Sequence, residues 1–235
     1  MKLNGTSIPD DVVQRVLARR GTLHSFADLD PKRTALVVID LQNAFMLDGV
    51  GHAVVPSARD IVPNVNRLAA TVRAAGGGVF WIKNTHDAGC LTEWSVAHEI
   101  STPAMREKRI AAMSENTKGH ELWAELDVQP GDEIVKKYRF SAFMPGTSDL
   151  ADRLRARGFD TVLITGTVTN VCCESSARDA MMTNFKVIMV SDGNAANTQA
   201  EHDASLTAFY NIFGDVQDTD MVIANLRRAI APQAA

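Results

Sequence analysis

The sequence predicts an α/β fold of three layers, in which helices cover both faces of a six-stranded, mostly parallel central sheet. Short apolar runs rich in β-branched residues recur along the chain, which is typical of strands buried on both faces. Helical patterns lie between most of these runs, and the alternation of strand and helix indicates a parallel sheet. The chain has 235 residues, 46% of them hydrophobic, which is enough for one sizeable core.

Each strand is predicted from one short apolar run. The first, "TALVVID", is a β-branched run that ends on Asp40. In chain order the runs cover residues 34–40, 77–83, 132–138, 161–166, 186–192 and, more weakly, 214–220.

Three helices are predicted between the strands from the signals at their ends. Residues 57–76 close on glycines, and residues 200–213 follow the fifth run. Residues 147–158 open on a threonine cap and close on a glycine. A further helix is expected to begin within "GTVTNVCCESSARDA" (166–180), with its threonine and asparagine at 169 and 170 as capping residues.

The predicted domain organisation is an N-terminal extension over residues 1–33 and one domain over residues 34–230. A long excursion at about residues 85–130 interrupts the alternation of strands and helices. It contains Trp94, Trp123 and several possible short helices. Such a segment serves equally well as a lid over a binding site or as an assembly interface.

The composition argues against several classes of partner. Net charge is −4 with acids and bases mixed along the chain, so neither a nucleic-acid surface nor a polybasic membrane anchor is expected. No apolar run approaches the ~20 residues of a membrane helix, and the first residues lack the apolar core of a signal peptide. The cysteines, Cys90, Cys172 and Cys173, fit free thiols in a reducing compartment. We therefore expect a cytoplasmic protein whose partner is a small molecule or another protein chain.

The strand ends supply the candidate functional residues, because ligands of open parallel sheets bind beyond the carboxyl ends of the strands. Asp40 ends the first run, lysines lie at the ends of the second and third, and Cys172 stands six residues after Gly166. An acid, a lysine and a thiol therefore converge on one rim. Each also has an ordinary structural explanation, as a turn acid, a solvated edge lysine or a small buried hydrophobe.

Three motifs also carry a resemblance to a known family. The stretches "ALVVIDLQNAF", "KKYRFSAF…GTSDL" and "LITGTVTNVCCESSARDA" occur in this order within about residues 34–225. Together they closely resemble the isochorismatase-like superfamily of cysteine hydrolases. The resemblance implies an isochorismatase-like fold and a catalytic triad of Asp40, Lys137 and Cys172.

The motif spacing decides between neighbouring candidates. The family places its lysine four residues before a serine, here Ser141, which selects Lys137 over Lys136. The nucleophile is Cys172 by its place in the third motif, and Cys173 is expected to be part of the core.

The chemistry that the resemblance implies is hydrolysis of an amide-type carbon–nitrogen bond through a thioester. A helix N-terminus and the nearby lysine are expected to stabilise the thiolate of Cys172. Asp40 would take the thiol proton and later give it to the leaving amine or ammonia. The N–H groups of Cys172 and Val168 are implied as the oxyanion hole, with a cis Thr167–Val168 peptide bond.

The subgroups of the superfamily differ in substrate. Nicotinamidases carry an Asp and two His residues that hold a metal near the end of the second strand. Here His86 and Asp87 have no second histidine nearby in the sequence, so no metal or other cofactor is expected. The chain looks most like ureidoacrylate and other ureide-type amidohydrolases, which act on small linear amides or ureides. Phe45, Asn84 and Phe140 are expected to line the pocket, and relatives imply a homodimer or homotetramer.

Two alternatives remain at this stage. An isochorismatase-type vinyl-ether hydrolase would not need the thiol nucleophile. A thiol-based redox or binding module would use the adjacent Cys172 and Cys173, although such sites generally space their thiols as C-x-x-C.

Overall fold

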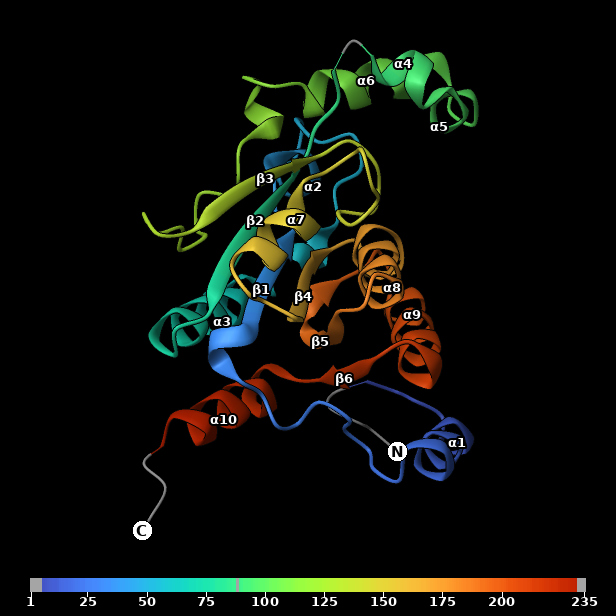
Figure 1. Ribbon diagram of the computed structural model, residues 1–235. Helices are drawn as coiled ribbons and strands as arrows, with labels where there is room; N and C mark the ends of the chain where they lie inside the picture. The colour runs from blue at the N-terminus through green and yellow to red at the C-terminus, as the bar shows by residue number, and fades with distance from the viewer. Residues whose placement is uncertain (1–5, 88, 232–235) are drawn as a thin grey trace.

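The computed structural model describes residues 6–87 and 89–231, and residues 1–5 of the predicted N-terminal extension lie outside them. The described residues form one six-stranded sheet in the order β3-β2-β1-β4-β5-β6 (Figure 1). The strands are β1 (Thr34–Ile39), β2 (Gly78–Asn84), β3 (Glu133–Lys137), β4 (Thr161–Thr167), β5 (Lys186–Ala195) and β6 (Asp215–Gln217). All neighbouring strands are parallel. The predicted three-layer α/β fold is therefore confirmed, and the sheet is parallel throughout.

Helices cover both faces of this sheet (Figure 1). One face carries α1 (Asp10–Arg20), α7 (Leu150–Ala156), α8 (Glu174–Met182) and α9 (Gln199–Ile212), and the other carries α3 (Val62–Ala74) and α10 (Thr219–Ile230). Side chains of β1 alternate between the two layers, with Val37 in one core and Val38 in the other. Because both cores are apolar, each central strand is hydrophobic on both faces, as its sequence predicted.

The remaining short elements connect these layers. They are α2 (Asn43–Met46), the 3-10 turns Pro31–Arg33 and Pro56–Ala58, and a π-helical turn at Thr169–Cys173 that leads into α8.

Two of the long helices were not predicted. α1 lies within the predicted extension and places Val12, Val13 and Val16 in the same core as α9. Asp10 and Asp11 lie in its first turn, Arg19 and Arg20 lie in its last, and Gly21 ends it in a left-handed conformation. These are ordinary helix-end signals. α10 begins at Thr219, where the sequence had suggested the end of a weak strand.

The start of α7 corrects a sequence prediction. Thr147 does not cap this helix: its hydroxyl donates to the Met144 carbonyl at 3.0 Å, and the helix starts two residues later with Asp149 as the N-cap. The Thr147 side chain therefore stabilises the turn before α7 and is not available as its cap.

The excursion contains several short helices, as expected. They are α4 (Cys90–Glu93), α5 (Ser95–Glu99), α6 (Pro103–Met113) and a 3-10 turn at Lys118–His120. Figure 1 shows α4, α5 and α6 gathered beyond the carboxyl ends of β2 and β3. The returning arm is tied to the sheet by backbone hydrogen bonds, His86 N–H to the Met113 carbonyl at 3.0 Å and Trp123 N–H to the Leu41 carbonyl at 2.9 Å. The excursion therefore covers the rim on which the candidate residues converge.

Among the helices of residues 6–87 and 89–231, none combines the length and the apolar character needed to cross a lipid bilayer.

Candidate active site

Asp40 occupies a strained backbone position directly after β1. Its φ of 55° lies in the left-handed region, which non-glycine residues seldom adopt. The side chain is fully buried. Strain of this kind costs about 1–3 kcal/mol and concentrates at functional sites. The backbone geometry thus marks Asp40 independently of any motif.

The structure brings Asp40, Lys137 and Cys172 together in an enclosed space. Lys137 ends β3 and its Nζ lies 2.8 Å from Asp40 Oδ2, close enough for an ion pair although the direction falls short of good hydrogen-bond geometry. The ammonium also donates to the Arg139 carbonyl at 3.1 Å. Relative exposure is 0% for Asp40 and Lys137 and 3% for Cys172. These residues come from three strand ends far apart in the sequence.

The neighbouring lysine points the other way. Successive side chains of a strand alternate between its faces, so Lys136 leaves the sheet on the side opposite Lys137. Its Nζ lies 2.7 Å from Glu115 Oε2, and both side chains are 45% exposed. Lys136 is therefore a surface residue with an ordinary ion pair.

Burial and mutual charge shift the pKa values of all three groups. Burial raises the pKa of Asp40, against the opposing charge of Lys137. Burial acts to lower the pKa of Lys137, but the attraction of Asp40 and Cys172 outweighs it, so that pKa is raised. Burial also raises the pKa of Cys172, which Lys137 only partly offsets. Burial therefore acts against the stabilised thiolate that the sequence predicted, and the charge of Asp40 adds to this effect.

The turn that carries Cys172 is a π-helical one rather than the first turn of an ordinary helix. The Val168 carbonyl accepts hydrogen bonds from the N–H groups of Val171 at 3.0 Å and Cys173 at 3.2 Å. The Thr167–Val168 peptide bond is cis, as the resemblance implied.

The expected capping role of Thr169 and Asn170 is not seen. The Thr169 hydroxyl lies 2.9 Å from His202 Nδ1, on α9, and no side-chain cap bond forms at the start of the turn. Asn170 Oδ1 is buried without a hydrogen-bond partner among the described residues. The Thr169 hydroxyl thus links the π-helical turn to α9 instead of capping the helix.

Cys173 lies in the core, as expected. It is fully buried, and its Sγ lies 4.0 Å from the Thr165 carbonyl oxygen. Burial raises its pKa well above the usual thiol range, with the charges of Cys172 and Asp40 adding to the effect.

The three residues expected to contact substrate lie at different depths. Asn84 ends β2, is 3% exposed, and helps to stabilise the Asp40 carboxylate. Phe45, in α2, is 5% exposed. Phe140 lies further out, 41% exposed, with its ring edge-on to Trp94 at a centroid distance of 4.7 Å.

Sequence reasoning missed the residues that hold these groups in place. Gln42 is fully buried, and its side-chain amide makes two hydrogen bonds to the Asn84 backbone. Its Oε1 accepts from the Asn84 N–H at 2.7 Å, and its Nε2 donates to the Asn84 carbonyl at 3.2 Å. Ser176 donates to the Cys172 carbonyl at 2.6 Å and accepts from the Ala142 N–H at 3.0 Å, which joins α8 to the loop after β3. A helical spacing of four from Cys172 was the available signal for Ser176.

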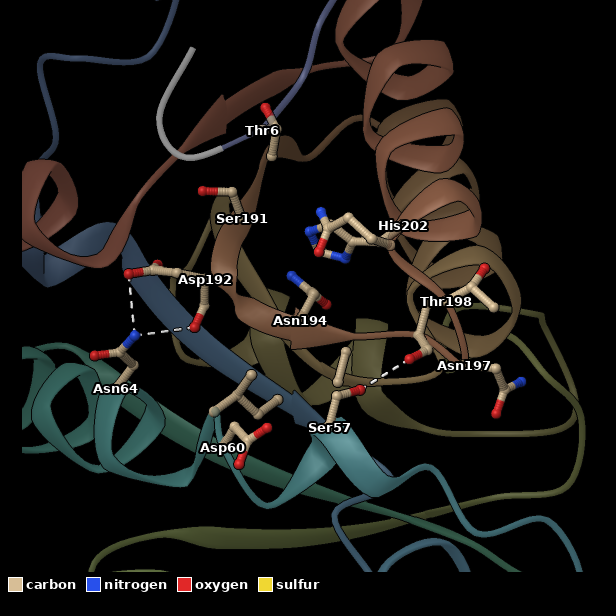
Figure 2. A pocket seen from close by; sticks show the side chains of 14 residues that line it. Thr6, Ser57, Asp60, Asn64, Ser191, Asp192, Asn194, Asn197, Thr198 and His202 are labelled. Carbon is tan, nitrogen blue, oxygen red and sulfur yellow. Dashed lines mark hydrogen bonds between the residues drawn. The ribbon is translucent and has the colours of Figure 1, made fainter. Parts of the chain in front are cut away.

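A second polar pocket lies at the carboxyl end of β5, with a volume of about 420 Å³. Figure 2 shows Asn194 and His202 pointing into it from β5 and α9. None of Asp40, Lys137 and Cys172 lines this pocket. This pocket and the three catalytic candidates therefore lie at different places along the carboxyl edge of the sheet.

One group of side chains has the donor types of a metal site. His86, Cys90 and His98 are all buried, and one ligand atom of each lies within 4.8 Å of the others. The sequence had indicated no second histidine near His86, and the structure corrects this: α5 brings His98 back so that the two rings lie 5.7 Å apart.

Comparisons with known proteins agree with the geometry. Residues 34–221 match the isochorismatase domain family. Among curated proteins, the ureidoacrylate amidohydrolase RutB of Pseudomonas savastanoi pv. phaseolicola is 32% identical over 231 residues, covering 92% of this chain and 91% of the relative. That of Variovorax paradoxus is 33% identical over 218 residues, covering 86% and 83%.

Solved structures give the same picture. A cysteine hydrolase from Pseudomonas syringae pv. phaseolicola superposes with a TM-score of 0.76 at 32% identity, covering 88% of this chain and 98% of that one. The N-carbamoylsarcosine amidase of Thermoplasma acidophilum superposes with a TM-score of 0.63 at 26% identity, covering 80% and 97%.

Proposed function

The chain belongs to the isochorismatase family of hydrolases, and on this basis we propose that it is an amidohydrolase that cleaves a carbon–nitrogen bond of a small linear amide or ureide. The observation that carries the proposal is the buried group of Asp40, Lys137 and Cys172, with an acid after β1, an ammonium at the end of β3 and a thiol in the turn after β4. The names of the relatives, ureidoacrylate amidohydrolase and N-carbamoylsarcosine amidase, support a ureide-type substrate.

The first step proposed is attack of the Cys172 sulfur on the carbonyl carbon. Because burial raises the pKa of Cys172 and disfavours its thiolate, the thiol proton leaves as the carbon–sulfur bond forms. Asp40 is the base, because burial raises its pKa and makes it a better proton acceptor than an ordinary carboxylate. Lys137 remains charged and keeps the Asp40 carboxylate in position.

The oxyanion that forms in this step needs donors. We place them at the backbone N–H groups of Cys172 and Val168, and each such donor is worth about 3–4 kcal/mol of barrier by the precedent of comparable sites. Ser176, through the Cys172 carbonyl, helps to set the orientation of this turn.

Collapse of the intermediate returns the proton. The carbon–nitrogen bond breaks, Asp40 gives its proton to the leaving nitrogen, and ammonia or an amine departs. A water molecule, deprotonated by Asp40, then attacks the thioester, and Cys172 leaves with its proton restored. Only Cys172 of the three side chains has any exposed surface, 3%, which suits the residue that is to meet the substrate.

The test is release of ammonia from a panel of ureides and amides, with ureidoacrylate as the first compound. Cys172→Ala is expected to abolish turnover, whereas Cys173→Ala, a matched removal of the neighbouring thiol, is expected to keep it. Mass spectrometry of the Cys172 peptide during turnover should show an acyl adduct whose mass reports the substrate's acyl half.

The outcomes separate the alternatives. Loss of turnover in the Cys173 variant alone would show that the nucleophile is misassigned. Turnover of isochorismate that survives Cys172→Ala, with no ammonia released from any amide or ureide, would favour a vinyl-ether hydrolase instead.

A further inference from the structure

Three elements that meet above the end of β2 each contribute one buried, metal-ligating side chain. His86 stands two residues after β2, Cys90 is the first residue of α4, and His98 lies in α5. Their relative exposures are 2%, 3% and 2%. The ligand atoms lie within 4.8 Å of one another. The fold of the first part of the excursion thus brings these three side chains to one point.

The ring nitrogens at this point lack the hydrogen bonds that buried polar atoms normally make. His98 Nδ1 and Nε2 and His86 Nδ1 have no hydrogen-bond partner among the described residues. Leaving such a group buried and unsatisfied costs about 1–3 kcal/mol. Two adjacent rings with free nitrogens therefore indicate that something else occupies the space between them.

The donor types restrict what that occupant is. Two imidazoles and a thiolate are the ligands of tetrahedral Zn²⁺ sites, whereas hard cations such as Mg²⁺ and Ca²⁺ require oxygen ligands. Zinc bonds of about 2.0–2.3 Å place tetrahedral ligand atoms about 3.5 Å apart. An ion would therefore draw these ligand atoms together by up to about 1.3 Å from their present separation.

The surrounding charges act in both directions. Burial and the Asp87 carboxylate raise the pKa of the Cys90 thiol, whereas Arg139 and Arg109 act to lower it and also repel a cation. Asp87 supplies the compensating negative charge, and its carboxylate already accepts hydrogen bonds from the N–H groups of Gly89 at 3.0 Å and Cys90 at 3.1 Å. Arg109 is itself engaged by the Ala97 carbonyl at 3.0 Å. The bonds from an ion to its three ligands are shorter than its distances to these charges, so they contribute more to its binding.

We propose that His86, Cys90 and His98 form a Zn²⁺ site that fastens α4 and α5 to the end of β2. The fourth position is open for water. Because the three ligands belong to separate segments, the ion would cross-link the first half of the excursion, which otherwise depends on short helices. The proposal goes beyond the amidohydrolase reaction, and neither depends on the other.

The test uses the full-length protein. After loading with Zn²⁺ and exhaustive dialysis against metal-free buffer, elemental analysis should find one zinc ion per chain. Co²⁺ loaded in its place should show visible bands of tetrahedral intensity and a thiolate-to-cobalt charge-transfer band. Hydrogen exchange of residues 86–99 should slow when the metal is present.

Variants assign the ligands. Cys90→Ser and His98→Ala should each weaken zinc binding by more than about 100-fold, since even outer-sphere partners of a metal ligand contribute 10–100-fold. Cys90→Ser should also remove the charge-transfer band. Two controls should bind as the wild type does: Cys172→Ala, which removes the other candidate thiol, and His120→Gln, which removes a buried histidine already bonded to Thr85 Oγ at 2.8 Å.

The proposal is wrong if the wild-type chain retains no zinc, or if the Cys90 and His98 variants retain it as tightly as the wild type. If a variant fails to fold, the proposal is still tested on the wild-type protein. Zn²⁺ must raise the melting temperature of that protein, and no rise would contradict the proposal. Zinc binding with no amidohydrolase activity, or the reverse, would separate this proposal from the proposed function.

Discussion

At the scale of single residues, the ion pair of Asp40 and Lys137 sets the character of the proposed site. Both side chains are fully buried, so each charge depends on the other for its stabilisation. A buried pair contributes little net stability compared with apolar residues, but removing one partner leaves an uncompensated charge and costs about 3–5 kcal/mol. Such a pair is retained where the charges are used.

We expect Lys137→Met to lower the free energy of unfolding by about 3–5 kcal/mol and to abolish turnover, because Asp40 is then left alone in an apolar space. Lys136→Met is the matched control: its ion pair with Glu115 is exposed, so the loss should be under about 1 kcal/mol and turnover should persist. Urea unfolding and ammonia release measure both. Adding Asp40→Asn to Lys137→Met should restore much of the stability and none of the activity, and a double variant no more stable than the single one would contradict this.

The pH dependence of turnover reports the base. Asp40 must be ionised to accept the thiol proton, and its pKa is raised by burial, so kcat/KM should fall as pH falls through a midpoint above the usual value of about 4. The pKa of Lys137 is raised too, so its ammonium should stay protonated near neutral pH and cause no loss of kcat/KM there. The measurement is a pH profile of kcat/KM, with circular dichroism at each pH to exclude unfolding. An acid limb at or below about 4 would exclude Asp40 as the base.

At the scale of elements, the site depends on how closely β1 and β4 approach at their carboxyl ends. Gly166 has φ 118°, and a Cβ there would lie 2.0 Å from the Ile39 carbonyl oxygen. On the other side of β4, its pairing with β5 shifts register between Ile164 and Gly166. Only glycine permits the contact, which brings the Cys172 turn beside Asp40.

Gly166→Ala should therefore destabilise the protein by about 3 kcal/mol or more, since backbone strain and a backbone clash act together. Gly158→Ala is the control, because Gly158 also has a positive φ, 78°, but a methyl group added to its Cα would meet no neighbouring atom within 4 Å. Its cost should stay at about 1–2 kcal/mol. Thermal and denaturant unfolding of the two variants test the difference, and equal losses would show that backbone conformation alone accounts for the effect.

At the scale of the whole molecule, the excursion leaves apolar side chains in solvent. Val96 is 65% exposed and Ile100 is 82% exposed, both at α5. We propose that this surface is covered by a second copy of the chain in a homodimer or homotetramer, which is the state that the family resemblance implies.

Sedimentation velocity should then give a dimer or tetramer for the wild-type chain and a smaller species for Ile100→Lys, because a charge in an apolar contact opposes association. Ile212→Lys is the control, since Ile212 is also exposed, at 54%, but lies on α9. A monomeric wild type, or equal dissociation in both variants, would contradict the proposal.

The sequence alone indicated the six strands and their mostly parallel arrangement, and the resemblance of its motifs to a known family supplied the three candidate catalytic residues. Strand runs and end-of-strand positions are local patterns, and a parallel sheet gathers its carboxyl ends on one side whatever the loops do. The tertiary structure decided what depends on how the chain folds back on itself: the approach of His98 to His86, the two hydrogen bonds between Gln42 and the Asn84 backbone, and the burial of Cys172. Burial raises the pKa of Cys172 and so acts against the thiolate that the sequence predicted, and burial appears in no local pattern.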